Sequence, residues 1–114
     1  MDCGIEEREG VAIVSPRGDL DAEHVATFQS EIDRLLGDGV HYYVIDLGDV
    51  SFLDSSGLAA IVRLYKRVRI GEGDVRLARV PPSVMTVLEL TRLSKVFDIF
   101  ATAAEATASI KHQD

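Results

Sequence analysis

Asp54, Ser55 and Ser56 stand immediately before an apolar run of helical spacing in this 114-residue chain. Aspartate and serine at a helix start accept hydrogen bonds from free backbone amides, so capping alone would account for these residues. A serine at such a start can also carry a phosphate, because the free amides and the helix dipole tolerate a new dianion there. The two interpretations are compatible, and the residues by themselves leave both open.

A second polar loop, Gly18-Asp19-Leu20-Asp21, follows an earlier predicted strand. In open α/β sheets, functional residues gather in the loops at the carboxyl ends of the strands. A phosphate on Ser55 would add a charge of roughly −1.5 to −2, which any carboxylate near it would repel. The carboxylates available for this repulsion are those of Asp19, Asp21, Asp49 and Asp54.

The elements that must position these loops alternate between strands and helices. A hairpin is expected over residues 4–8 and 11–15, with its turn at Glu9-Gly10 and its end at Pro16-Arg17-Gly18. Further strands are expected over residues 42–47, 74–79 and 96–100.

Helical spacing predicts four helices. The first runs from an Asp21 N-cap to about Leu36, and the second follows Asp54. The third opens at Pro81-Pro82-Ser83, because proline suits the first turn of a helix. The last begins at a capping box over residues 102–105. The predicted fold class is therefore α/β: one domain over residues 1–114, with a mixed sheet of about five strands and about four helices.

Composition restricts the classes of partner. The net charge is −7, from 12 basic and 19 acidic residues, and this argues against nucleic acid as a ligand. Cys3 is the sole cysteine, which favours a reducing compartment over a disulfide. No apolar stretch approaches the roughly 18 residues of a membrane span, so we expect a cytoplasmic protein without a membrane segment.

Enzymatic and metal sites are not predicted. Three histidines are present, but there is no Gly-x-Ser-x-Gly elbow, and His112 stands near the chain end. Neither a His/Cys cluster nor the spacing of a calcium loop occurs, so no metal and no cofactor is expected. Asp46 ends a predicted strand, as does the phosphoacceptor of receiver domains, but the acidic pair that such domains need after their first strand is missing. The basic residues of the second helix form a predicted solvated face, and they are Arg63, Lys66, Arg67 and Arg69.

The segment over residues 44–57 resembles the signature of STAS domains, in particular bacterial anti-sigma-factor antagonists. It reads Val-Ile-Asp-Leu-Gly-Asp-Val-Ser-Phe-Leu-Asp-Ser-Ser-Gly. The family pattern is an apolar strand ending in Asp/Asn-Leu, followed by Val-x-Phe-x-Asp-Ser-Ser/Thr-Gly-Leu at the start of a helix. The Gly18-Asp19-Leu20-Asp21 segment matches a second family motif in the right order. The resemblance covers nearly the whole chain.

The resemblance implies a partner switch without enzymatic activity of its own. The unphosphorylated protein would bind an anti-sigma factor that is also a serine kinase, and sigma factor would be released. Phosphorylation of Ser55 by that kinase would end the binding, and a PP2C-like phosphatase would restore it. Carried over by position, the docking and presentation residues are Asp19, Asp21, Asp54, Ser56 and Gly57. Gly57, having no side chain, would let another backbone approach the serine.

Two departures from the family pattern bear on the partner more than on the mechanism. Ala59 stands where the family often has glycine, and Arg92 replaces the glycine of a Gly-Leu pair, which removes an easy positive-φ turn. The alternative function is a STAS interaction subunit without a phosphorylation cycle, in a signalling scaffold or a lipid-transport complex. Monomer and weak dimer both remain open.

Overall fold

The first two strands form an antiparallel hairpin. The computed structural model describes residues 1–111, so His112 lies outside the described part. Strand β1 (Asp2–Arg8) pairs with β2 (Val11–Leu20) along its whole length. The turn between them places Glu9 and Gly10 at φ 52° and 83°, the left-handed pair that a two-residue hairpin turn requires.

Within the described residues, the remaining elements alternate as predicted, with one strand and one 3-10 turn added. The elements in chain order are α1 (Val25–Gly37), β3 (Tyr42–Asp46), β4 (Val50–Leu53), α2 (Ser55–Ile70), β5 (Asp74–Ala78), α3 (Pro82–Leu90), η1 (Leu93–Lys95), β6 (Asp98–Phe100) and α4 (Ala103–Lys111).

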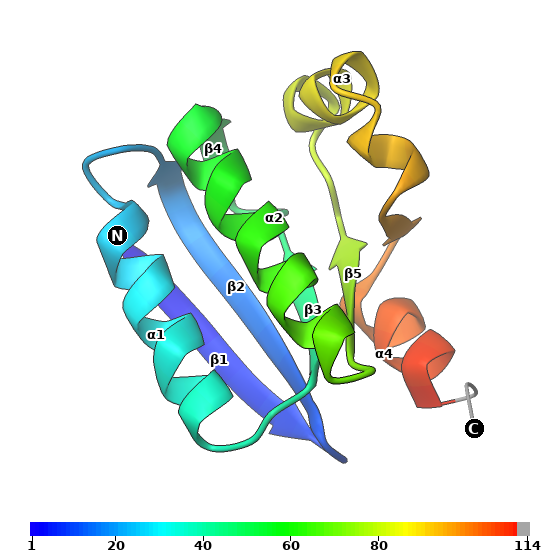
Figure 1. The fold of residues 1–114 in the computed structure, drawn as a ribbon. Coiled ribbons are helices and arrows are strands. Elements are labelled where there is room, and N and C mark those ends of the chain that lie inside the picture. Colours follow the sequence, from blue (N-terminus) through cyan, green and yellow to red (C-terminus); the bar gives the residue numbers. More distant parts are fainter. Residues whose placement is uncertain (112–114) are drawn as a thin grey trace.

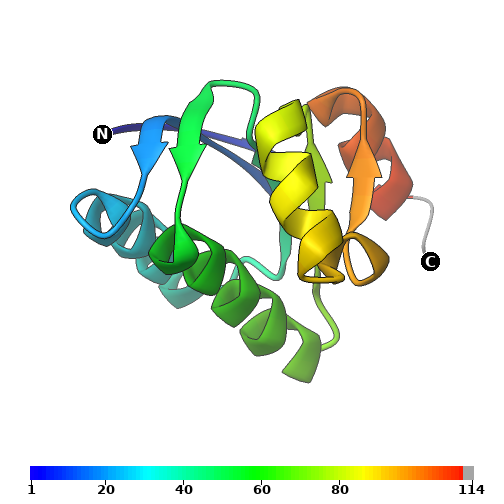
Figure 2. The same ribbon diagram turned by 90° about the horizontal axis from the view of Figure 1, so that it is seen from above.

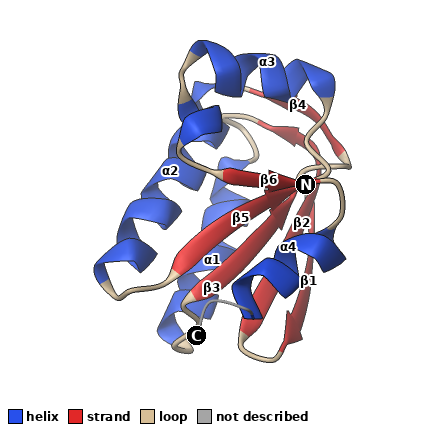
Figure 3. Ribbon diagram, turned by 90° about the vertical axis from the view of Figure 1, so that its right-hand side faces the viewer, coloured by secondary structure: helices blue, strands red, loops and turns tan. Residues whose placement is uncertain are grey.

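The sheet is mixed and has six strands in the order β1-β2-β3-β5-β6, with β4 paired to the far end of β2. Among the strands of residues 1–111, only the β1–β2 pair is antiparallel. Helices α1 and α2 cover one face of the sheet, and α4 lies against the opposite face (Figures 1 and 3). This arrangement follows from parallel strands joined by helical crossovers.

Side chains of β2 alternate between two hydrophobic clusters. Ala12 and Val14 face the larger cluster, which lies under α1, α2 and α3, whereas Val11 and Ile13 face the smaller cluster under α4. Successive residues of a strand point to opposite faces, so helices on both sides require apolar residues at consecutive positions.

Two predicted strand boundaries and one predicted loop were wrong. Strand β2 does not end before Pro16 but continues to Leu20. Pro16 lies between the β2 residues that pair with β3 and those that pair with β4, so no parallel neighbour pairs with it. The predicted last strand begins at Asp98, because residues 93–95 form a 3-10 turn. Strand β4 lies in a segment predicted to be loop.

The predicted N-cap of the first helix was also wrong. Helix α1 begins at Val25, and the residue at its N-cap position is His24, which makes no side-chain capping bond. The Asp21 carboxylate instead accepts from the backbone N–H of His24, at 3.1 Å, within a turn that precedes the helix. The start of α4 follows the prediction more closely, since Thr102 Oγ1 accepts from the N–H of Glu105 at 3.1 Å.

Arg92 adopts the positive-φ conformation that its side chain was expected to disfavour. Its φ is 64°, in the left-handed region, and it leads directly into η1. The expected loss of a positive-φ turn at this departure from the family pattern was therefore wrong.

Candidate functional site

The two polar loops identified in the sequence lie side by side. Strand β4 runs parallel to the end of β2, with Gly18 opposite Val50 and Leu20 opposite Leu53. The N–H of Gly18 donates to the Asp49 carbonyl at 2.9 Å. Viewed from above, the ends of β2 and β4 and the start of α2 gather at one end of the molecule (Figure 2). The pairing of β4 with β2 therefore builds one surface from two segments of the chain.

Asp54 fastens these segments together. Its Oδ1 accepts from the N–H groups of Ser56 and Gly57, at 2.8 and 3.0 Å, which caps α2 as the sequence predicts. Its Oδ2 accepts from the N–H of Ala22 at 3.0 Å, in the loop that follows β2. Both carboxylate oxygens are thus engaged within the chain, and Asp54 positions the loops around the serine.

Ser55 is the first residue of α2, and its side chain is exposed. Within residues 1–111 its hydroxyl has no hydrogen-bond partner, whereas Ser56 is half-buried. The first turn of α2 carries no acidic side chain. Of the two serines, Ser55 therefore offers the more accessible oxygen, at a helix N-terminus that accommodates an anion.

Gly57 is required by close packing against β2. A Cβ at this position would lie 2.2 Å from the carbonyl oxygen of Leu20 and 2.8 Å from the side chain of Leu53. The backbone that approaches Gly57 therefore belongs to the same chain. The missing side chain lets the start of α2 lie directly on the end of β2, and this contact sets where Ser55 projects.

Asp19 and Asp21 differ in their exposure and in their hydrogen bonding. Asp19 is exposed on β2. Asp21 Oδ1 lies 2.7 Å from the Nδ1 of His24. Desolvation works to raise the pKa of the Asp21 carboxyl, but the hydrogen bonds from the side chain and backbone of His24 lower it below its usual value. Both carboxylates therefore add negative charge to the surface around Ser55.

Arg79 holds the loop between β3 and β4, which leads into the strand before Ser55. Its Nε donates to both carboxylate oxygens of Asp46, at 2.9 and 3.1 Å, and its Nη2 lies 3.6 Å from Asp49 Oδ2. The hydrogen bond with Asp46 raises the pKa of the guanidinium. The Arg79 side chain occupies the space above Gly48, where a Cβ would come within 2.4 Å of Cζ. This clamp fixes the loop between β3 and β4, and sequence patterns did not reveal it because its partners are 33 residues apart.

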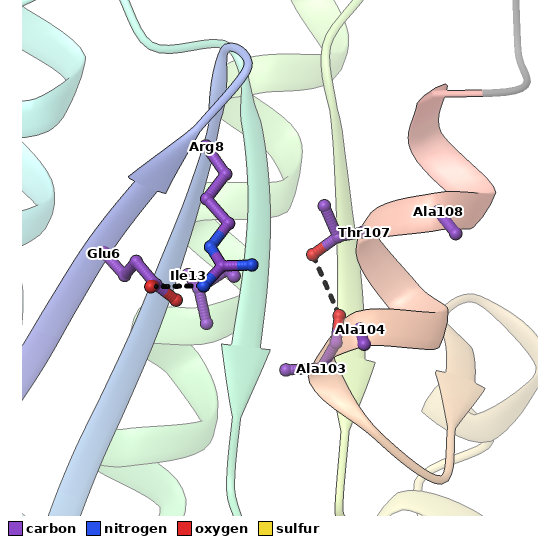
Figure 4. Close-up of a pocket in the computed structure, with 7 residues that line it drawn as sticks. All are labelled: Glu6, Arg8, Ile13, Ala103, Ala104, Thr107 and Ala108. Carbon is purple, nitrogen blue, oxygen red and sulfur yellow. Dashed lines mark hydrogen bonds and ion pairs between the residues drawn. The ribbon is translucent and has the colours of Figure 1, made fainter.

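A cavity of about 350 Å³ lies elsewhere, between the β1–β2 hairpin and α4 (Figure 4). The polar groups in its lining are paired with one another: Arg8 with Glu6 at 2.9 Å, and Thr107 Oγ1 with the Ala103 carbonyl at 2.8 Å. The cavity therefore presents no converging set of free polar groups, unlike the surface around Ser55. Within the described residues, no three His, Cys, Asp or Glu side chains converge on a possible metal position.

The fold and the site define a small α/β domain that displays a serine at the start of a helix, beside the end of a neighbouring strand. The chain belongs to the STAS domain family, whose model matches residues 3–106. No helix in residues 1–111 has the length and apolar character needed to cross a bilayer.

Curated relatives cover almost the whole chain. The chain is 27% identical over 108 residues to the anti-sigma F factor antagonist of Paenibacillus polymyxa, covering 94% of this chain and 92% of that protein. It is 22% identical over 111 residues to the putative anti-sigma factor antagonist BtrV of Bordetella bronchiseptica, covering 97% and 96%.

Solved structures agree with the fold. A putative anti-sigma factor antagonist from Thermotoga maritima superposes with a TM-score of 0.91 at 27% identity, covering 96% of this chain and 95% of the other. The anti-sigma factor antagonist SpoIIAA in its unphosphorylated form has a TM-score of 0.85 at 20% identity, with coverage of 96% for both chains, and this match supports the fold alone.

Proposed function

We propose that this protein is an anti-sigma-factor antagonist whose binding is switched off by phosphorylation of Ser55. Unphosphorylated, it binds an anti-sigma factor that is also a serine kinase, and sigma factor is freed. A PP2C-like phosphatase returns the phosphorylated protein to its binding form. The cycle runs in the cytoplasm, with the protein as a monomer or weak dimer.

The observation that carries this proposal is the exposed Ser55 hydroxyl, free of hydrogen bonds within the described chain, at the first residue of α2. In the reaction, Ser55 Oγ forms a bond to the γ-phosphorus of ATP while the bond to ADP breaks and the serine proton is released. An exposed hydroxyl without a competing partner suits this transfer. The names of the relatives, antagonists of anti-sigma factors, support the identity of the partner.

Electrostatics provides the switch. The helix N-terminus stabilises the new phosphate locally, so phosphorylation leaves the fold intact. The added charge of roughly −1.5 to −2 falls on a surface that already carries Asp19 and Asp21. After phosphorylation, the partner surface that accepts the neutral serine loses its contact with the hydroxyl. Burying the dianion against that surface also carries a large desolvation cost.

The site residues divide into two roles in this proposal. Asp19 and Asp21 lie on the docking surface itself. Asp54, Ser56 and Gly57 present Ser55, since they form or occupy the cap that joins α2 to the end of β2.

Binding of Ser55 variants to the anti-sigma factor tests the proposal. Ser55→Ala should keep the affinity of the unphosphorylated protein and resist inactivation by ATP, whereas Ser55→Asp should bind weakly. Ser56→Ala is the matched control and should still be inactivated by ATP. Equal binding by Ser55→Ala and Ser55→Asp would contradict the switch.

A further inference from the structure

Phe52 is exposed although its side chain is large and apolar. It is 54% exposed, whereas Phe28 and Phe97 are 0% and 3% exposed. It lies three residues before Ser55, on β4, opposite Asp19 of β2. Single exposed apolar side chains are common on protein surfaces, so the position of Phe52, three residues before Ser55, matters more than its exposure alone.

The pairing of β4 with β2 imposes this outward position. Gly18 is opposite Val50, but the next residue, Asp19, is opposite Phe52, so Ser51 is an extra residue in β4. This bulge turns both Ser51 and Phe52 outward while Val50 and Leu53 stay buried at 5% and 7% exposure. Leu53 is thereby anchored in the core directly before Asp54, and Phe52 is held on the same surface as Ser55.

The rim around Phe52 is acidic. Asp19 is its cross-strand neighbour, Asp21 follows in the same loop, and Asp49 stands just before β4. Of the basic groups nearby, His24 is paired with Asp21, and Arg79 with Asp46 and Asp49. Arg17, two residues before Asp19 on β2, is exposed. The surface therefore combines one apolar anchor with a border of negative charge.

We propose that Phe52 is the apolar anchor of the docking surface, and that it enters a pocket on the serine kinase that is lined by apolar side chains and bordered by Lys or Arg. This inference rests on the proposed function and adds the residue that determines recognition. Aromatic anchors dominate many interfaces because they bury a large area at a low cost in conformational entropy. Acidic residues around an anchor speed association with a basic partner and set its orientation.

The continuity of the Phe52 surface with Ser55 favours the kinase over any other occupant. Ile70 is more exposed than Phe52, at 88%, but it ends α2 at the far end of that helix. A helix of 16 residues is about 24 Å long, so Ile70 cannot share a compact docking patch with Ser55. Ile70 therefore provides a matched control for the removal of an exposed apolar side chain.

The test uses the full-length chain as substrate for the Ser55 kinase activity enriched from the native cytosol, with radiolabelled ATP. Initial rates are measured over a range of substrate concentrations for the wild type, Phe52→Ala, Phe52→Leu and Ile70→Ala. Phe52→Ala should raise KM by about tenfold or more, because an anchor is lost, while kcat changes little. Phe52→Leu should recover part of the affinity, and Ile70→Ala should match the wild type.

The outcomes separate this inference from the proposed function. A wild-type chain that is never phosphorylated on Ser55 would overturn the proposed function and the inference with it. A wild-type chain that is phosphorylated, with an unchanged KM for Phe52→Ala, would overturn the anchor alone. An equal rise in KM for Ile70→Ala would also overturn it, because the effect would then not be specific to this surface. Thermal unfolding of each variant shows whether the fold is retained.

Discussion

The carboxylate of Asp54 and the backbone N–H of Ala22 are joined by a 3.0 Å hydrogen bond between residues 32 positions apart. The same carboxylate caps α2 through its other oxygen. One side chain therefore fixes the position of the helix that carries Ser55 relative to the loop that carries Asp21.

Replacing Asp54 should lower the free energy of unfolding by an amount that depends on whether the new side chain keeps an acceptor oxygen. Asp54→Ala removes the helix cap and the bond to Ala22, each worth about 1 kcal/mol, so we expect a loss of about 2 kcal/mol in the free energy of unfolding. Asp54→Asn keeps one carbonyl acceptor and should lose about half as much. Urea unfolding measures both. Equal stabilities for Asp54→Asn and Asp54→Ala would show that the acceptor oxygen retained by asparagine contributes nothing.

Gly57→Ala should be destabilising although alanine is the better helix former. The added Cβ would lie 2.2 Å from the Leu20 carbonyl oxygen, and relieving this clash should cost about 1–3 kcal/mol, more than the gain of about 1 kcal/mol in helix propensity. Gly37→Ala is the control, because no atom lies within 4 Å of a Cβ there and the position is in the last turn of α1. Opposite signs for the two changes in urea unfolding are the expected result; a stabilised Gly57→Ala would contradict the packing.

The Arg79 clamp should contribute to stability through Asp46. Arg79→Ala leaves a carboxylate that is only 10% exposed without its partner. Arg79 itself is 44% exposed, so solvent screening limits the expected loss to about 1–2 kcal/mol. The matched control is Arg92→Ala, because Arg92 also has a positive φ, 64° against 49°, and its side chain has no ion pair within the described residues. Equal losses for both variants would assign the effect to the backbone rather than to the clamp.

Cys3 should react slowly until the pH is high. Burial, with a smaller effect of the Glu31 charge, raises the pKa of the thiol from 9.0 to about 11. Because only the thiolate is alkylated, the folded protein at pH 8 should react roughly a hundredfold more slowly than the chain unfolded in urea. The folded rate should keep rising with pH up to about 11, whereas the unfolded rate levels off near 9. Equal rates at pH 8 would contradict a half-buried thiol with a raised pKa.

The regular elements could be predicted from the sequence because their apolar periodicity is uninterrupted. In α2, Ile61, Leu64 and Val68 recur at helical spacing and are all buried. Strand β4 could not be predicted in this way, because its bulge breaks the alternation of buried and exposed residues. That bulge depends on the register against β2, which short-range patterns do not specify.

The candidate site could be predicted in part. The cap on α2 follows from local sequence, and Asp54 performs it as expected. The predicted start of α1 was wrong because Asp21 makes its hydrogen bonds to His24 within a turn that precedes the helix. The bond from Ala22 to Asp54, the clamp by Arg79 and the exposure of Phe52 all depend on contacts between distant segments, so only the structure reveals them.

The phosphorylation state of the native protein tests the central claim most directly. Intact-mass and peptide mass spectrometry would be carried out on the protein purified from its own cells, with and without phosphatase treatment. We predict a phosphatase-sensitive phosphate on Ser55 and none on Ser56. A phosphate found only on Ser56 would assign the phosphorylation site to Ser56 instead of Ser55. No phosphate under any growth condition, including those in which the kinase is active, would contradict the switch.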